Sequence, residues 1–513
     1  RDLLNAFRSG FVEVKSTTPE LLAVLADSNA GDVVRLTVAR TLVEFDDPET
    51  VRPLFELSES SGSQFKMLIE PALARWDYRP IREIWRARLD NEKTFHRELL
   101  LACRGSGITQ DAAALAGLLK LVHSPERPRD VRLAAARAAA QIAEKQLEPE
   151  AKRLLAPSNP ASIDRLCAVS LLQRHDSPEA RELLRQLFAD SNGSVAHPAI
   201  GRLYEIDPAL VLELFERASV HSDAAVRRVA ARSYITLPAV ERLSGLARLL
   251  DDPDPPLRRE VRDALLRFSQ QAEFAAPVRE LSMQILHADG WRGQEQAALI
   301  LGKLDYDPAA DRLVELLASN RSEVVITSAW GLKQLAVPAT LPAMLARATL
   351  QNESPQSDDL VAVDRQMAHL FEAMGQMDYK PAIPLARKMV PKVLDHRRLS
   401  RAAACWSLGY LMDGLSDEQF ETELFDRAAD DMSLMPEIEI VRWMCAISLG
   451  RLKAKSQLDA LIKKIGPTVE DSPPEHAMLW SIRLLGGKDV PLREPPPDYV
   501  LREWLIQPLN SNP

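Results

Sequence analysis

The stretch Ala225-Val226-Arg227-Arg228-Val229-Ala230-Ala231-Arg232 decides the fold of this chain because it recurs along the sequence. Closely similar stretches occupy residues 32–40 (DVVRLTVAR) and 130–137 (DVRLAAAR), and shorter copies contain Leu257-Arg258 and Val441-Arg442. A motif that returns this often predicts an array of structural repeats.

The Val-Arg arginine of each copy gives the spacing of the array. With that arginine as an anchor, the commonest step is 31 residues, and the related positions lie near residues 35, 66, 97, 132, 165, 196, 227, 258, 294, 325, 367, 401, 442 and 478. Each unit has room for two helices of about 10 to 13 residues and two short turns. The sequence therefore predicts about 14 helix pairs.

Apolar residues around each anchor fall on one face of a helix. Near residue 227 they are Val226, Ala230, Ala231, Tyr234 and Leu237. This spacing is typical of an amphipathic second helix, and its small residues allow neighbouring helices to approach closely.

The turn into each following first helix contains an Asp or Ser and then a Pro. We expect the Asp or Ser to cap the free backbone N–H groups and the Pro to occupy the first helical position. Examples are Asp46-Asp47-Pro48, Asp77-Tyr78-Arg79-Pro80, Asp176-Ser177-Pro178, Asp207-Pro208, Asp305-Tyr306-Asp307-Pro308 and Asp378-Tyr379-Lys380-Pro381.

These units resemble HEAT repeats, especially the short bacterial type. The matching features are the D-V-R start of the second helix, the D-x-P turn, and a Leu-Gly or Met-Gly pair near the helix end, at Leu301-Gly302, Met374-Gly375, Leu408-Gly409, Leu449-Gly450 and Leu485-Gly486. The resemblance implies an all-α, right-handed α-α superhelix of about 14 helix pairs. It also implies a scaffold, adaptor or complex subunit, because HEAT arrays serve many such roles.

Three interruptions and a tail punctuate the expected array. We predict one continuous solenoid over residues 1–489, with inserted loops near 124–130, 351–359 and 413–439. Residues 490–513 are rich in proline and read as a C-terminal cap or tail on the last repeat.

Composition limits the classes of partner. A net charge of −9 opposes nucleic-acid binding, and no run of about 18 apolar residues predicts a membrane span. Four cysteines without a CxxC pair fit buried thiols and favour the cytoplasm, and the start at Arg1 leaves an extracytoplasmic location open.

No catalytic, cofactor-binding or metal-binding residues emerge from the motifs. None of the nine histidines precedes a glutamate, which argues against the di-iron hydroxylases built on similar repeats, and phosphate-binding and nucleophile-elbow motifs are missing. We expect no enzyme and no cofactor. The alternative is a lyase-like enzyme that handles a prosthetic group, whose signature is little more than the repeats themselves.

The position five residues after each anchor lies off the apolar stripe, on the side that lines the concave face in HEAT arrays. It carries Arg40, Arg137 and Arg232 in the first half, and Trp330 and Trp406 in the second, with Tyr410 one turn after Trp406. These six residues are the predicted partner-binding set, and the two tryptophans with Tyr410 would form its apolar floor. The competing interpretation is that the rings fill gaps between alanine-rich helices.

The acidic stretch between residues 413 and 439 offers a second possible surface. Its acids could attract a basic partner segment, or they could be a solvated helix face: Asp417, Glu418, Glu421, Glu423, Asp426, Asp430 and Asp431. The sequence thus predicts a non-enzymatic protein–protein interaction scaffold or adaptor, whose concave surface binds another protein, either alone or as a module of a larger chain or complex.

Overall fold

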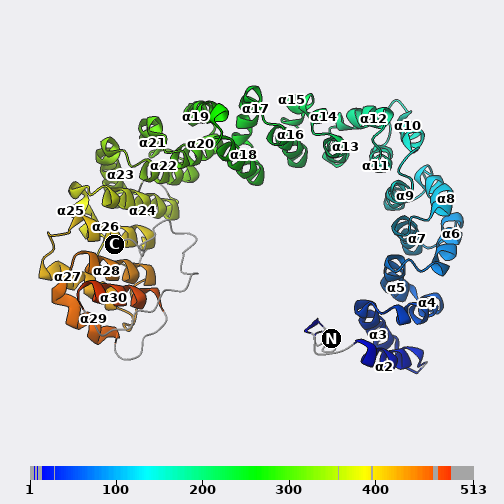
Figure 1. Ribbon diagram of the computed structural model, residues 1–513, viewed down its shortest axis with the longest axis horizontal. Helices are drawn as coiled ribbons and strands as arrows, with labels where there is room; N and C mark the ends of the chain where they lie inside the picture. Colours follow the sequence, from blue (N-terminus) through cyan, green and yellow to red (C-terminus); the bar gives the residue numbers. More distant parts are fainter. Residues whose placement is uncertain are drawn as a thin grey trace. The chain divides into compact units, whose positions relative to one another are not determined.

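The chain is described by a computed structural model, which places residues 5, 8–9, 14–27, 29–355, 358–393, 397–465 and 472–486. These described residues form α-helices, short 3-10 helices and turns, and they contain no β-strand. The helices divide into two compact units, Arg1–Leu237 and Pro238–Pro513. Each unit is a stack of helix pairs, so the predicted all-α superhelix of helix pairs is confirmed (Figure 1).

Unit 1 contains seven helix pairs among its described residues. Its first helices are α2 (Val14–Ala26), α4 (Val51–Ser60), α6 (Pro80–Asp90), α8 (Leu115–Val122), α10 (Glu148–Leu155), α12 (Pro178–Phe188), and α14 (Ala209–Leu212) with α15 (Phe215–Ala218). Its second helices are α3 (Asp32–Phe45), α5 (Ser63–Arg75), α7 (His96–Ile108), α9 (Arg129–Ile142), α11 (Ser162–Leu171), α13 (Gly193–Ile206) and α16 (Ala224–Thr236).

Unit 2 contains another seven pairs among its described residues, which gives the 14 that the sequence predicts. Its first helices are α17 (Leu243–Arg248), α19 (Ala272–His287), α21 (Ala310–Leu316), α23 (Leu341–Glu353), α25 (Ile383–Lys388), α27 (Glu418–Ala429) and α29 (Leu458–Ile465). Its second helices are α18 (Pro255–Phe268), α20 (Trp291–Lys303), α22 (Ser322–Leu335), α24 (Leu360–Gln376), α26 (Arg398–Leu411), α28 (Glu439–Arg451) and α30 (Pro473–Leu484).

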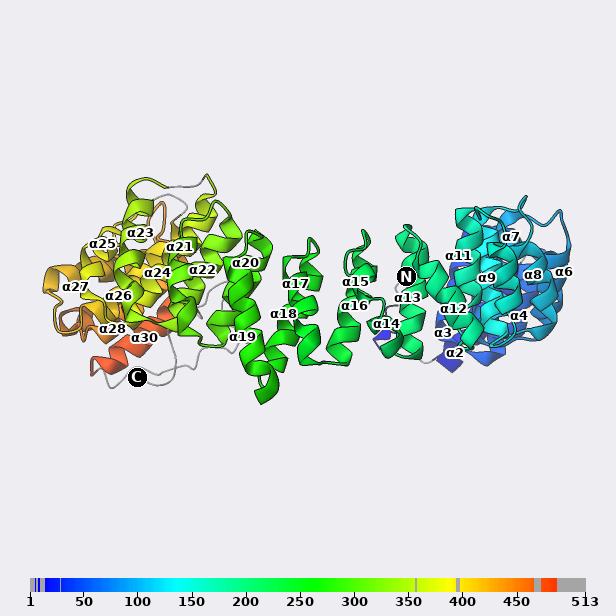
Figure 2. The ribbon, with the colours of Figure 1, turned by 90° about the horizontal axis from the view of Figure 1, so that it is seen from above.

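Within each unit the first helices form one layer and the second helices another (Figures 1 and 2). All of the predicted anchor positions lie in second helices. The apolar stripe around each anchor is buried between the two layers, as at Val226, Ala230 and Ala231 of α16, which are each 0% exposed. The spacing of apolar residues therefore predicted both where the second helices lie and which of their faces is buried.

The anchor arginines tie segments of the array together. Arg132 donates from Nε to the carbonyl of Val122 at 2.9 Å, and its Nη2 lies 2.5 Å from Oδ1 of Asp164 in the next pair. Comparable contacts join Arg35 to the Leu25 carbonyl (3.3 Å), Arg165 to Asp190 (2.7 Å), Arg227 to the His221 carbonyl (2.8 Å), Arg258 to the Asp252 carbonyl (2.8 Å) and Arg442 to the Ala428 carbonyl (3.2 Å). The predicted structural role of these arginines is confirmed.

The Asp-Pro turns differ from the prediction at several positions. The first Asp of four turns adopts the left-handed conformation with φ of 50° to 56° and follows the second helix, at Asp46, Asp77, Asp305 and Asp378. The prediction that these residues cap the next helix is wrong, because their backbone already turns the chain, a conformation that short polar side chains tolerate. Asp47 and Ser177 do cap: they accept from the N–H groups of Glu49 and Ala180, both at 3.1 Å.

The predicted interruptions are only partly loops. Residues 124–128 form a loop before α9, and residues 354–359 separate α23 from α24, with 356 and 357 outside the described residues. Most of the third interruption, 413–439, is instead α27, the regular first helix of its pair. Its acidic composition concealed the apolar positions Phe420, Leu424 and Ala428, which are all 0% exposed.

Two predictions on domain organisation are untested. The single continuous solenoid over 1–489 stays a prediction, and the cap or tail at 490–513 lies outside the described residues. Among the helices that the structure describes, none is both long and apolar enough to cross a bilayer.

Candidate functional site

Small residues hold the second helices of unit 2 close together. A Cβ atom added to Gly409 of α26 would lie 2.7 Å from Oγ of Ser448 in α28, and one added to Gly450 would lie 2.6 Å from Oγ of Ser481 in α30. The serines also bridge the helices, because Ser448 donates to the carbonyl of Cys405 at 2.7 Å and Ser481 to that of Ala446 at 2.6 Å. These contacts fix the positions of side chains along the layer.

The predicted tryptophans lie across this layer of small residues. The Trp330 ring on α22 lies 2.8 Å from a Cβ built on Gly302 of α20, and the Trp406 ring on α26 lies 3.4 Å from one built on Gly375 of α24. Trp406 is 4% exposed, and Trp330 is half-buried. One side of each ring therefore packs against a glycine of the preceding second helix, as the competing interpretation expects, in which the rings cover gaps between helices packed through small residues.

Tyr410 and Arg451 complete an aromatic cluster around Trp406. The Tyr410 ring lies edge-to-face with the Trp406 ring, with centroids 4.8 Å apart. The guanidinium carbon of Arg451, at the end of α28, lies 4.1 Å from the Tyr410 centroid and 5.1 Å from that of Trp406. Burial lowers the pKa of Arg451 from 12.5 to about 10, and the cation is further held by the faces of the two rings.

Two buried indole N–H groups of unit 2 have no acceptor among the described residues. Nε1 of Trp406 on α26 and Nε1 of Trp443 on α28 are both buried without a hydrogen-bond partner in the part of the chain that the structure describes, and each tryptophan is only 4% exposed. A buried donor without an acceptor is unfavourable by about 1–3 kcal/mol. Tyr410, by contrast, is 39% exposed, so the cluster reaches the surface. We name Trp406, Tyr410 and Arg451 the aromatic–arginine site.

The predicted arginines Arg40, Arg137 and Arg232 belong to unit 1. They lie on α3, α9 and α16 and are all exposed, off the apolar stripe, where the spacing placed them. They therefore line the second-helix layer of a different unit from the predicted aromatic residues. Their predicted role in binding a partner remains a proposal.

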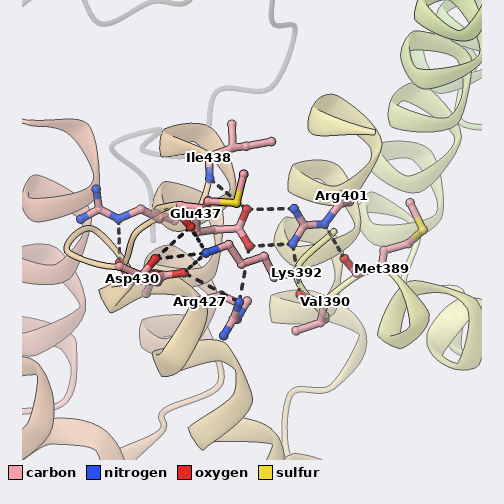
Figure 3. A network of polar contacts seen from close by, with 12 residues as sticks. Met389, Val390, Lys392, Arg401, Arg427, Asp430, Glu437 and Ile438 are labelled. Carbon is pink, nitrogen blue, oxygen red and sulfur yellow. Dashed lines mark hydrogen bonds and ion pairs between the residues drawn. The ribbon is translucent and has the colours of Figure 1, made fainter. Parts of the chain in front are cut away.

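A buried ion pair joins Arg401 of α26 to Glu437, which lies just before the start of α28 (Figure 3). Arg401 of α26 and Glu437 are both 1% exposed at their side chains, and they form two hydrogen bonds of 2.8 Å. Arg401 also donates to the carbonyls of Met389 at 3.1 Å and Val390 at 3.3 Å, and Glu437 accepts from the N–H of Ile438 at 2.9 Å. Burial opposes the charge of Arg401, but its bonds with Glu437 outweigh burial and raise its pKa.

The same network holds the loop between α27 and α28. Lys392 donates to Oδ2 of Asp430 at 2.6 Å and to the carbonyl of Met435, and Arg427 lies 3.8 Å from Glu437 (Figure 3). The hydrogen bond from Lys392 lowers the pKa of Asp430. The loop so fixed leaves Met432 89% exposed.

The acids of the predicted second surface mostly serve this architecture. Asp417 caps α27 by accepting from the Phe420 N–H at 2.7 Å, and Glu421 accepts from Ser416 at 3.0 Å. Asp431 pairs with Arg442 at 3.0 Å and Lys464 at 2.5 Å. A basic partner segment would have to compete with these internal partners.

A buried polar group also lies in the second-helix layer of unit 2. Glu372 of α24 accepts from Nζ of Lys333 on α22 at 2.8 Å and lies 3.0 Å from Nδ1 of His369. These acid and base groups bond to one another. Among the described residues, no cluster of His, Cys, Asp and Glu could hold a metal ion.

The cysteines are buried thiols, as the sequence predicts. Burial raises the pKa of Cys103 and of Cys167 from 9.0 to about 12, and burial also raises that of Cys445. Such thiols stay protonated near neutral pH and are poor nucleophiles.

Sequence reasoning missed Arg451 and the donor role of Trp443. Arg451 lies nine residues after the anchor Arg442, so it follows the fifth position by one helical turn, and Tyr410 stands at the same register on α26. Reading that second register along the chain would have found it. Nothing in the sequence signals the missing acceptors of Trp406 and Trp443, because they depend on which groups the neighbouring helices present.

Comparison with known proteins shows the fold of this chain. Models of known protein families and curated proteins give no match. Among solved structures, the chain is similar to Kap95p, the yeast importin-beta, in its structure with RanGDP, at 14% identity and a TM-score of 0.53 over 91% of this chain and 67% of that one. It is also similar to a mutant of Kap121p at 12% identity and a TM-score of 0.57, over 92% of this chain and 57% of that one. The chain thus spans less than two thirds of Kap121p.

Proposed function

We propose that this chain is a protein-binding solenoid scaffold and that the aromatic–arginine site on unit 2 contacts an extended segment of its partner. The observation that carries the proposal is the aromatic pair of Trp406 and Tyr410, whose ring centroids lie 4.8 Å apart and which reaches the surface through Tyr410, 39% exposed. Large aromatic and arginine side chains also dominate the binding energy of protein interfaces.

Further features support the proposal. The exposed Tyr410 ring gives the site an edge at the surface, and the Arg451 guanidinium lies against that ring, 4.1 Å from its centroid. The Trp330 ring lies on α22 against Gly302 of α20, and it would provide a separate aromatic contact. Kap95p, whose fold is similar, is described in complex with RanGDP, so this architecture supports protein binding in that case.

The finer assignments belong to the same proposal. We infer that the repeats are HEAT repeats of the short bacterial type, on the Leu-Gly and D-V-R motifs. The exposed Arg40, Arg137 and Arg232 would provide a second, basic contact surface on unit 1 for the same partner. The scaffold acts by holding these side chains in place and needs no cofactor.

The test immobilises the 513-residue chain, exposes it to extract from its native source and measures which proteins it retains. We expect wild type to retain one or two proteins in stoichiometric amount, and Tyr410→Ala and Arg451→Gln to retain them at least tenfold less, because both remove contacts at the edge of the site. Phe95→Ala is the matched control, since Phe95 is an aromatic residue 77% exposed in unit 1. Full retention by folded Tyr410→Ala and Arg451→Gln proteins would contradict the proposal.

A further inference from the structure

A cavity of about 430 Å³ lies in unit 1, bounded by the first helices α2 and α4 and by one side chain of α3. Its apolar walls include Leu22 and Leu25 of α2 and Pro53 and Leu57 of α4. Arg35 of α3 is the one cation that lines it among the described residues. Ligand sites begin at about 300 Å³, so this α2–α4 cavity has room for a few side chains of a bound segment.

Arg35 brings an incompletely bonded guanidinium to the α2–α4 cavity. Its Nε donates to the carbonyl of Leu25 at 3.3 Å, and this is the one polar contact of its side chain with residues that the structure describes. A guanidinium carries five N–H donors in a planar fork that matches a carboxylate. Arg35, Leu22 and Pro53 are half-buried and Glu56 is exposed, so the cavity is open to solvent. The Nη donors of Arg35 are therefore available to a ligand.

The other repeats show which chemistry an anchor cation binds. At six other anchor positions the cation pairs with a carboxylate of the array, as Lys66 with Glu98 (2.8 Å), Arg132 with Asp164 (2.5 Å), Arg165 with Asp190 (2.7 Å), Arg258 with Glu295 (3.7 Å), Arg401 with Glu437 (2.8 Å) and Arg442 with Asp431 (3.0 Å).

The helix after Arg35 does not supply such a carboxylate. Glu98 and Asp164 stand in the first turn of the next second helix, α7 and α11 respectively. The next second helix after Arg35 is α5, which has no acidic residue in its first turn. At Arg35 the array thus leaves open a place that it fills with a carboxylate elsewhere, and an open place beside a cavity can be filled by a partner.

The walls of the α2–α4 cavity specify what accompanies the carboxylate. Leu22 and Pro53 keep part of their apolar surface exposed, so a bulky aliphatic side chain next to the acid would bury it. Glu56 also lines the cavity, and it accepts from Nε of Arg52 at 2.9 Å. A second acid in the ligand would be repelled by Glu56, which favours a segment with a single acid.

We propose that the α2–α4 cavity binds a partner segment in which one aspartate or glutamate stands beside a bulky aliphatic residue. The carboxylate accepts from the Nη groups of Arg35, and the aliphatic side chain packs against Leu22 and Pro53. The inference rests on the proposed function of the chain as a protein-binding scaffold. It adds to that function a contact on the first-helix layer of unit 1.

The experiment selects ligands from random heptapeptides displayed on phage, with the immobilised 513-residue chain as bait. Enriched peptides are synthesised with a fluorescent label, and anisotropy measures their binding to wild type and to Arg35→Gln. We expect a group of peptides with one acid next to Leu, Ile, Val or Met, which bind Arg35→Gln about tenfold more weakly because a charged hydrogen bond is lost.

A double-mutant cycle locates the contact. Replacing the acid of the peptide by its amide should weaken binding to wild type about tenfold and change binding to Arg35→Gln much less, because the two groups act as a pair. Leu22→Ala should weaken binding severalfold through the lost apolar wall. Arg35→Lys should keep most of the affinity, since Lys66 pairs with an acid in the next repeat.

Arg97→Gln is the matched control. Arg97 is an exposed arginine at another anchor position and does not line the cavity, so its replacement should leave peptide binding unchanged. Circular dichroism and thermal unfolding check that every variant folds, and Arg35→Lys and Leu22→Ala keep the test decisive if Arg35→Gln does not.

Several results would overturn the inference. They are a selection without peptides that depend on Arg35, a double-mutant cycle without coupling, and binding of free 4-methylpentanoate as tight as that of the peptides, which would assign the cavity to a small carboxylate. A wild-type dimer that Arg35→Gln converts to monomer in sedimentation would assign it to a second copy of the chain. Retention of a partner that still depends on Tyr410 would leave the proposed function standing in each case.

Discussion

The second-helix layers of the two units follow the same repeat but present different side chains at their surfaces. In unit 2 close contacts between adjacent helices pass through glycine and serine, as at Gly409 against Ser448. An ion pair spans one step in each unit, Lys66 with Glu98 in unit 1 and Lys333 with Glu372 in unit 2, both at 2.8 Å. The α7–α9 step of unit 1 also has a close contact, with a Cβ on Gly107 lying 3.0 Å from Cα of Ala138.

The difference teaches how one repeat produces two kinds of surface. Small residues bring the helices of unit 2 together, so aromatic rings lie across them and form an apolar site with buried donors. In unit 1 the same register carries Arg40 and Arg137, which are exposed and make no ion pair with any residue that the structure describes. The side chains carried at this register, rather than the fold class, thus separate the two surfaces.

Breaking the buried ion pair of unit 2 should have the largest effect. Arg401→Met leaves Glu437 buried without its partner, which should lower the free energy of unfolding by about 3–5 kcal/mol. Chemical denaturation measures the change in the free energy of unfolding, and native-state hydrogen exchange shows whether the loss falls in α26 and α28. The double variant Arg401→Met, Glu437→Leu should recover much of the loss, and a single variant as stable as wild type would contradict the role given to this pair.

Core truncations test whether the two units share the same packing between layers. Leu449→Ala in α28 and Leu42→Ala in α3 each remove a side chain that is 0% exposed. Each should cost about 2–5 kcal/mol within its own repeats, because stability in such arrays comes from neighbouring pairs. Hydrogen exchange should show the loss near the substitution. A uniform loss across both units would contradict local coupling.

A glycine in each unit tests the contacts between second helices. Gly409→Ala places a Cβ atom 2.7 Å from Ser448 Oγ and should destabilise unit 2 by about 1–3 kcal/mol. Gly201→Ala is the matched control, since a Cβ on Gly201 of α13 meets no atom within 4 Å. That change should stabilise unit 1 by about 0.5–1 kcal/mol through helix propensity. Thermal unfolding of both variants measures the two changes in stability. Equal changes for Gly409→Ala and Gly201→Ala would contradict the role given to the glycine contacts.

Acid should destabilise the loop at residues 430–437 of unit 2 and leave the loop at residues 124–128 of unit 1 unchanged. The folded pKa of Asp430 lies below the value of about 3.9 in an unfolded chain, so the unfolded state takes up the proton first as pH falls. The stabilisation is complete above about pH 5 and disappears as pH falls through the folded pKa.

Hydrogen exchange of residues 430–437 between pH 6 and 3, corrected for intrinsic rates, measures this effect. Lys392→Gln should remove most of the pH dependence, since Lys392 is the main cause of the lowered pKa. The loop at 124–128 is the comparison, because Arg127 and Ser124 bond there to carbonyl oxygens, which do not ionise. Equal pH dependence in both loops would contradict the assignment.

Much of this architecture was predictable from periodicity. The anchor spacing predicted the helix pairs, and the apolar stripe predicted which face is buried, because both depend on local geometry with a fixed repeat. The acidic α27 was missed as a helix because charged residues outnumber its buried Phe420, Leu424 and Ala428. The turn aspartates were assigned the wrong role because sequence does not distinguish a residue that ends one helix from one that caps the next.

The sequence by itself determined the number of helix pairs, their order and the structural role of the anchor arginines. These properties follow from hydrophobic periodicity and from contacts between neighbouring pairs, which the repeat imposes at every step. Tertiary structure alone decided that Trp406, Tyr410 and Arg451 form one cluster and that two indole donors lack acceptors among the described residues. The reason is physical: the approach of α26 to α28 depends on side-chain volumes on both helices, and a hydrogen-bond donor is satisfied or orphaned only by what its neighbours place beside it.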